Sequence, residues 1–252
     1  MHTIRLDLQY DGSEYAGWQI QENAVTVQEL VERALSMILR ERIRVSGASR
    51  TDSGVHALGQ VAAFTTESEI PMEKLRRSLN GILPPDIRLT DAREVEAGFA
   101  PRYAREKTYR YAFALGAYLS PFQRRYAWHI HEPLDLEAMQ AAANYLVGEH
   151  DFSSFVAAGG GEKGHVRTIH GISFGEGGIL NSCVGNEGLF HFDITANGFL
   201  YKMARNIIGT LVEAGRGKLP AQSMAAILEA RDRGLAGPTA PAQGLCLVSV
   251  KY

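Results

Sequence analysis

Apolar and polar residues alternate over positions 3–10, where Ile4, Leu6, Leu8 and Tyr10 share one face. This two-residue period predicts a half-buried strand. Similar patterns predict strands over 108–115, 166–174, 189–196 and 245–250, and another around Ile87 and Leu89. Two more strands are predicted to flank a glycine-bounded segment, the first carrying Ile43 and Val45 and the second Val61, Ala63 and Phe64.

Between these strands lie segments whose apolar residues recur with a helical period. Thr26 and Glu29 form a capping box ahead of an apolar stripe made of Val27, Leu30, Val31, Ala34, Leu35 and Ile38. Pro71 opens a second predicted helix that ends near Asn80, and Asp135 caps a third. Further helices are predicted over 199–214 and 221–230.

The order of these elements repeats, which predicts an α+β protein of two similar halves, residues 1–103 and 104–252. Each half is expected to form an antiparallel sheet with helices packed on one face. Because ligand sites are common at domain junctions, we expect a cleft between the halves.

Composition narrows the class of protein. No apolar run reaches the roughly 20 residues of a membrane helix, and the N-terminus does not resemble a signal peptide, so we expect a cytoplasmic protein without membrane contact. Cys183 and Cys246 lack metal-ligand spacing and are expected to be structural thiols in a reducing compartment. His129 and His131 are the nearest approach to a ligand pair, and packing explains them better than a metal.

The formal net charge of −2 argues against a cationic field over the whole protein, but basic residues still gather in local clusters. Each cluster alone is explained by a solvated surface. The clusters are Arg40, Arg42, Arg44 and Arg50; Lys74, Arg76 and Arg77; Arg102, Arg105, Lys107 and Arg110; Arg124 and Arg125; and Lys202 and Arg205.

The segment 47–61 places one carboxylate, that of Asp52, in a turn rich in glycine and serine, two residues after Arg50. Such a turn can hold an ionised acid that serves as nucleophile, base or electrostatic stabiliser. The simpler interpretation is an Asx turn, in which the Asp52 side chain binds its own backbone. Local chemistry alone favours the Asx turn.

Two other segments combine aromatic and basic residues. In Lys107-Thr108-Tyr109-Arg110-Tyr111 the tyrosines could stack on bases while the cations bind phosphates. Taken by itself, the segment is better explained by a strand with a buried aromatic face and solvated cations. In the segment 199–209, Lys202 and Arg205 lie three residues apart on one side of a predicted helix. If these two side chains face a cleft, they could bind a phosphate or a carboxylate. If they face outward, they are ordinary solvated surface cations.

Taken in order, these motifs resemble the tRNA pseudouridine synthases of the TruA family over nearly the whole chain. The most specific string is Arg50-Thr51-Asp52-x-Gly54-Val55-His56-Ala57. Ser49 departs from the glycine found there in many members, but a small residue still allows the turn. The other matching segments are Tyr10-Asp11-Gly12, Gly17-Trp18-Gln19, Gly59-Gln60-Val61, Lys107-x-Tyr109-x-Tyr111, Asp151-Phe152-Ser153-Ser154-Phe155, Met203-x-Arg205-Asn206-Ile207-x-Gly209 and Gly244-Leu245.

The resemblance implies an isomerase that converts uridine to pseudouridine at positions 38, 39 and 40 of the tRNA anticodon arm. Asp52 matches the catalytic aspartate, which attacks the ribose or the base of a flipped-out uridine. Tyr109 matches the tyrosine that stacks on the target base. Arg50 would occupy the space that the flipped-out uridine leaves or contact phosphate, and Arg205 would pair with Asp52. The resemblance also implies a homodimer that needs no metal and no cofactor.

Two alternatives come from other classes of protein. A noncatalytic RNA-binding module would need the basic and aromatic segments but not Asp52. A small-molecule glycosidase or lyase would generally need a second carboxylate, and no second acid lies in the matched motifs. The glycine-rich segment 159–164 is either a mobile lid or a tolerated connection.

Overall fold

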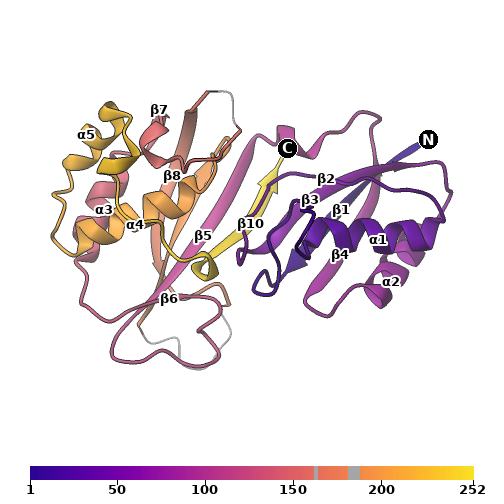
Figure 1. The fold of residues 1–252 in the computed structure, drawn as a ribbon, viewed down its shortest axis with the longest axis horizontal. Coiled ribbons are helices and arrows are strands. Elements are labelled where there is room, and N and C mark those ends of the chain that lie inside the picture. Colours follow the sequence, from indigo (N-terminus) through magenta and orange to yellow (C-terminus); the bar gives the residue numbers. More distant parts are fainter. Residues whose placement is uncertain (162–163, 181–187) are drawn as a thin grey trace. The chain divides into compact units, whose positions relative to one another are not determined.

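The chain folds into two compact units in a computed structural model that describes residues 1–161, 164–180 and 188–252 (Figure 1). Unit 1 comprises Met1–Arg105 and Leu247–Tyr252, and unit 2 comprises Glu106–Cys246. The sequence placed the division after residue 103 and assigned the whole C-terminus to the second half. In the structure, the last strand, β10 (Leu245–Lys251), begins in unit 2 and ends in unit 1. Cys183, and residues 162 and 163 of the glycine-rich segment, lie outside the described residues.

Unit 1 is built on an antiparallel sheet with β1 at its centre. The strands are β1 (His2–Tyr10), β2 (Ser46–Gly47), β3 (His56–Thr66) and β4 (Ile87–Val95). β1 pairs with β3 on one side and β4 on the other, β2 pairs with β3, and the unit 1 part of β10 lies beside β3. Helices α1 (Val27–Leu39) and α2 (Met72–Ile82) pack together, and α2 packs on β4.

The predicted helix start at Thr26 is confirmed, because the Thr26 side chain accepts a hydrogen bond from the Glu29 amide at 3.4 Å. The apolar stripe faces the core, where Val27, Val31 and Leu35 are buried together with Ile4, Leu6 and Leu8 of β1. The predicted alternation of β1 is therefore confirmed as well.

The strand predicted at Ile43 and Val45 is wrong. These residues are buried but have no strand pairing; β2 covers only Ser46 and Gly47. Instead, two buried polar side chains of α1 hold the segment. Glu32 Oε1 accepts the Val45 amide at 2.9 Å, and Gln28 Nε2 donates to the Val45 carbonyl at 2.8 Å. Side chains thus satisfy the backbone groups that a strand neighbour would otherwise satisfy.

The strands of unit 2 pair in the order β5-β9-β8-β7, and neighbours in this order are antiparallel. The strands are β5 (Glu106–Leu115), β6 (Trp128–Ile130), β7 (Gly148–Asp151), β8 (Val166–Glu176) and β9 (Leu189–Ala196). The sequence did not predict β6 or β7. β6 pairs in parallel with β5, a departure from the predicted all-antiparallel sheet.

Three helices accompany these strands: α3 (Leu136–Asn144), α4 (Met203–Gly215) and α5 (Ser223–Ala230). The Asp135 cap is confirmed, since its carboxylate accepts the Ala138 amide at 2.9 Å. The predicted helix start at Phe199 is four residues early. Lys202 adopts a left-handed conformation with φ of 57°, which breaks the helical path immediately before Met203. Short 3₁₀ turns occur at Pro101–Tyr103, Ser153–Phe155, Arg233–Leu235 and Ala242–Gly244.

The predicted α+β class is confirmed in both units. Within the described ranges, no helix is long and apolar enough to cross a membrane. The same residues contain no group of three or more histidine, cysteine or acidic side chains arranged to hold a metal ion. Cys246 is a buried thiol.

Candidate active site

Asp52 opens a four-residue turn in unit 1 and is partly exposed, while Arg50 is exposed. The Val55 amide donates to the Asp52 carbonyl at 3.1 Å, and Gly54 has a φ of 77°. A positive φ at the third residue of a turn favours glycine, which explains the residue at this position. The turn is closed by the main chain.

A neighbouring loop supports the turn at Tyr15. The Tyr15 carbonyl accepts the Gly54 amide at 3.3 Å and the Ser53 hydroxyl at 3.1 Å. The Tyr15 carbonyl therefore fixes both Ser53 and Gly54 of the turn that carries Asp52.

Tyr15 is itself fixed by Asp86, a residue that sequence reasoning did not single out. The Tyr15 hydroxyl donates to Asp86 Oδ1 at 2.5 Å. Burial, followed by this hydrogen bond, raises the pKa of Tyr15 well above its usual range, so the phenol stays protonated as a donor. No local signal could have linked two residues 71 positions apart.

A buried polar network holds the residues that precede Asp52. The Thr51 hydroxyl lies 2.8 Å from that of Tyr10, and Gln60 Nε2 donates to the Tyr10 hydroxyl at 3.3 Å. Gln60 also bonds both backbone groups of Ser49, donating to the carbonyl at 2.7 Å and accepting from the amide at 3.2 Å. Gln60 is completely buried, and such a network rigidifies the backbone it binds. The network fixes the strand-to-turn path that presents Arg50 and Asp52.

Close backbone packing explains two glycines of the matched motifs. A Cβ on Gly12 would lie 2.0 Å from the Val55 carbonyl oxygen. Gly17 has a φ of 93°, and a Cβ there would lie 2.6 Å from the Thr51 carbonyl oxygen. These glycines let the loop after β1 pack directly on the Asp52 turn. His56 Nδ1 accepts the Gly12 amide at 3.0 Å and ties the two segments further.

In unit 2, Tyr109 lies on β5 and is 5% exposed. Its ring meets Phe199 edge-on, with ring centroids 4.9 Å apart. Tyr111, two residues later on the same face, is fully buried and donates to the Pro241 carbonyl at 2.8 Å. The predicted aromatic face is therefore confirmed, with Tyr109 at the end where Phe199 leads toward α4.

Arg205 lies in the first turn of α4 and is partly exposed. Its Nε donates to the Ala240 carbonyl at 2.8 Å, and the Ala240 amide donates back to the Arg205 carbonyl at 3.1 Å. The charge of Arg205 also acts on the buried Tyr111 hydroxyl, lowering a pKa that burial raises far more. Arg205 is thereby held near the β5 face that carries Tyr109.

The other residues of the Arg205 motif build this support. Gly209 lets the Pro238 backbone approach, because a Cβ there would lie 1.6 Å from the Pro238 carbonyl oxygen. Asn206 is fully buried, donates to the Phe155 carbonyl at 2.7 Å, and accepts the Thr239 hydroxyl at 2.6 Å. These contacts dock the chain around 238–240 against α4.

The Asp151 segment is structural as well. Asp151 Oδ1 accepts the Ser153 hydroxyl at 2.6 Å and the Ser153 amide at 3.0 Å. This hydrogen bond with the Ser153 hydroxyl is the largest cause that lowers the pKa of Asp151. Ser153 also lies 2.8 Å from His165 Nδ1. The arrangement leads directly into Phe155, whose carbonyl binds Asn206.

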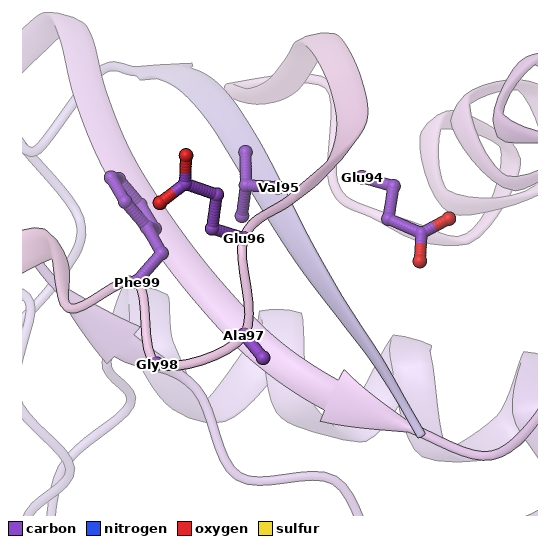
Figure 2. A pocket seen from close by; sticks show the side chains of 6 residues that line it. All are labelled: Glu94, Val95, Glu96, Ala97, Gly98 and Phe99. Atoms are coloured by element: carbon purple, nitrogen blue, oxygen red, sulfur yellow. The ribbon is translucent and has the colours of Figure 1, made fainter.

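A hollow of about 620 Å³ lies elsewhere in unit 1, along the end of β4 and the turn that follows (Figure 2). It is lined by Glu94, Val95, Glu96, Ala97, Gly98 and Phe99. The carboxylates of Glu94 and Glu96 make it a poor match for a phosphate backbone. None of the residues predicted to act on RNA lines it.

The structure therefore places Arg50 two residues before the turn that Asp52 opens in unit 1, and Tyr109 and Arg205 near one sheet face of unit 2. Sequence reasoning missed Tyr15 and Asp86, which support the turn. It also gave Phe199 no role, although the aromatic residue stood within a segment that the sequence singled out.

Comparison with known proteins shows which family this sequence matches. Residues 8–104 and 142–252 match the family model described as tRNA pseudouridine synthase. Proteins named tRNA pseudouridine synthase A from Thermoanaerobacter sp. (strain X514), Geobacter sulfurreducens and Moorella thermoacetica are 44%, 43% and 46% identical, each covering 100% of both chains. A chain from a Cbf5-Nop10-Gar1 complex aligns with a TM-score of 0.37 and 11% identity over 97% of this chain and 48% of that one, too distant to add support. The chain belongs to the tRNA pseudouridine synthase family of isomerases.

Proposed function

We propose that this protein isomerises uridines 38, 39 and 40 in the anticodon stem-loop of tRNA to pseudouridine, with Asp52 as the nucleophile. Family membership supports uridine isomerisation in tRNA. The observation that carries the role of Asp52 is the construction of its turn. The Tyr15 carbonyl binds Ser53 and Gly54, so contacts from a neighbouring loop hold the turn that presents the Asp52 carboxylate.

The reaction conserves all atoms of the nucleotide. The glycosidic bond between ribose C1′ and uracil N1 breaks, the uracil rotates, and a bond from C1′ to C5 forms. The hydrogen on C5 leaves as a proton, and N1 gains one, so no oxidant or reductant is consumed. Asp52 attacks the ribose or the base to allow the first bond to break, and is released when the carbon bond has formed.

The remaining predicted residues hold the substrate. Extruding the uridine from its stack costs a few kcal/mol, which stacking and phosphate contacts offset. Tyr109 offers an aromatic ring that Phe199 holds in place. In the proposal, Arg205 pairs with the Asp52 carboxylate, and Arg50, which is exposed, contacts phosphate or fills the space left by the uridine.

The protein is proposed to act in the cytoplasm as a homodimer whose two subunits share one tRNA. This would spread the basic clusters over two chains and reconcile the net charge of −2 with an RNA substrate. Sedimentation at micromolar concentration tests the dimer, and a protein that sediments only as a monomer contradicts it.

The decisive experiment compares the unaltered protein with Asp52→Asn on unmodified tRNA, with pseudouridine mapped chemically. We expect pseudouridine in the anticodon arm with the unaltered protein and none with Asp52→Asn, while RNA affinity stays within about two-fold. Asp91→Asn is the matched control, because Asp91 is an exposed carboxylate of unit 1 paired with Arg93.

The other outcomes contradict the proposal in different ways. Unchanged activity in Asp52→Asn contradicts the role of Asp52 as the nucleophile. Binding without any isomerisation by the unaltered protein indicates a noncatalytic RNA-binding module. Efficient conversion of free uridine favours a small-molecule enzyme instead.

A further inference from the structure

Lys107 is a half-buried cation on the same strand and the same face as Tyr109, and no step described above uses it. Residues two apart on a strand share a face, so Lys107, Tyr109 and Tyr111 form one row along β5. Tyr109 and Tyr111 are buried, whereas Lys107 stands at the start of the row and is partly exposed.

A second cation, Arg167, lies on this face two strands away. Lys107 is directly opposite Ala196 of β9, and Ala196 is directly opposite Ile169 of β8. Arg167 precedes Ile169 by two residues and therefore shares its face. A Cβ on Gly198 would lie 3.5 Å from Arg167 Nε, which places the Arg167 side chain against the backbone next to Phe199.

These contacts bring both cations to the surroundings of Tyr109. Phe199 touches Tyr109 at a centroid distance of 4.9 Å, and Arg167 packs on the residue before Phe199. Arg167 donates to two neutral acceptors, the carbonyls of Gly164 and Val166, at 3.3 and 2.6 Å. Among the residues that the structure describes, no salt bridge to Arg167 is formed, so its positive charge stays uncompensated there.

The two cations repel each other. Burial, followed by the charge of Arg167, lowers the pKa of Lys107 to about 8. Lys107 therefore remains mostly protonated at neutral pH although its surroundings oppose the charge. An anion bound near both groups would relieve the repulsion, and a phosphate accepts hydrogen bonds from lysine and arginine together.

We propose that Lys107 and Arg167 form a phosphate-binding pair beside Tyr109, which holds one backbone phosphate next to the uridine being isomerised. This inference rests on the proposed function, since it takes the ligand to be the RNA substrate. Other charged groups nearby have different tasks. Asp193 of β9 is bound by Arg110 on the opposite face, through contacts of 2.8 Å, and His150, opposite Arg167 in the β7–β8 register, bonds the Val147 carbonyl.

The test is a phosphate scan by RNA binding. Anticodon stem-loop RNAs, each with one neutral methylphosphonate linkage, are titrated against the full chain carrying Asp52→Asn, so that no RNA is converted. The same series is repeated with Lys107→Met, Arg167→Met and both substitutions together. Methionine keeps the apolar length of Lys107 in its half-buried position. Lys218→Met is the matched control, because Lys218 is an exposed lysine of unit 2 paired with Glu213.

We expect one linkage beside the target uridine to weaken binding about ten-fold, the effect of losing one hydrogen bond to a charged group. The doubly substituted protein should bind about ten-fold or more weakly overall and be insensitive at that one linkage. Its salt dependence should fall by a slope of about 0.7, as expected for one lost phosphate contact on single-stranded RNA. Lys107→Arg, which keeps the positive charge, should bind the RNA more tightly than Lys107→Met and retain most of the affinity of the protein with Lys107.

The inference is overturned if the doubly substituted protein keeps the linkage profile of Asp52→Asn alone, or loses affinity equally at every linkage. Failure of the proposed function is seen separately, as absence of pseudouridine when the unaltered protein is incubated with the unmodified stem-loop. A melting temperature close to that of Lys218→Met shows that the substituted proteins are folded.

Discussion

The contact between Gly209 and Pro238 yields the sharpest prediction. An added Cβ at Gly209 would lie 1.6 Å from the Pro238 carbonyl oxygen, far inside van der Waals contact, and that oxygen belongs to backbone that has no flexible side chain to move aside. Gly209→Ala must therefore push the 238–240 segment away from α4. Overpacking of this kind costs about 1–3 kcal/mol.

The displacement of the 238–240 segment reaches Arg205 through hydrogen bonds. The Ala240 backbone makes two hydrogen bonds with Arg205, at 2.8 and 3.1 Å, and lies two residues from Pro238. A shift of this segment should move the guanidinium. If Arg205 pairs with Asp52 as proposed, misplacement of this group by about 1 Å can cost about 100-fold in rate. We expect Gly209→Ala to lower kcat/KM on tRNA by about 10- to 100-fold.

The matched control is Gly81→Ala, the same substitution in helix α2, where no atom lies within 4 Å of the added Cβ. There alanine should stabilise the protein by up to about 1 kcal/mol, because it reduces the entropy of the unfolded chain. Scanning calorimetry should show Gly209→Ala melting lower by about 2–4 °C for each kcal/mol lost, and Gly81→Ala melting at the same temperature as the unaltered protein or higher. Equal melting temperatures and unchanged kcat/KM for Gly209→Ala would refute the reasoning.

Three further changes test the supports of the site. Thr51→Val removes the 2.8 Å bond to Tyr10 and should cost about 1 kcal/mol of unfolding free energy by denaturant titration; no loss would show that the network does not hold the turn. Asn206→Leu leaves buried partners unpaired and should cost more than Thr51→Val, by at least about 1–3 kcal/mol in the same titration; an equal or smaller cost would contradict this. The hydrogen bond from Ser153 lowers the folded-state pKa of Asp151, so its stabilisation is present above the unfolded pKa of about 3.9 and is lost as pH falls through the folded pKa. Asp151→Asn should thus cost stability at pH 7 and little at the lowest pH, as followed by thermal melts across pH; a cost independent of pH would contradict the linkage.

The sequence by itself determined most elements and the chemical candidates. Hydrophobic periodicity located β1, β9 and the helix behind the Thr26 cap, because each buries one face, and burial imposes a period of two or 3.6 residues. The Arg50–Asp52 motif was readable for a similar reason, since it is local in the chain.

Only the tertiary structure decided what depends on distant partners. The 43–45 segment has strand-like residues, but two polar side chains of α1 satisfy its backbone in place of a neighbouring strand. Lys202 adopts a left-handed φ that delays the start of α4 to Met203, and no pattern of apolar residues encodes it. Asp86 secures the Asp52 turn through Tyr15, which lies 71 residues from Asp86 in the sequence. Each depends on hydrogen bonds or close packing between segments far apart in sequence, which periodicity and spacing cannot report.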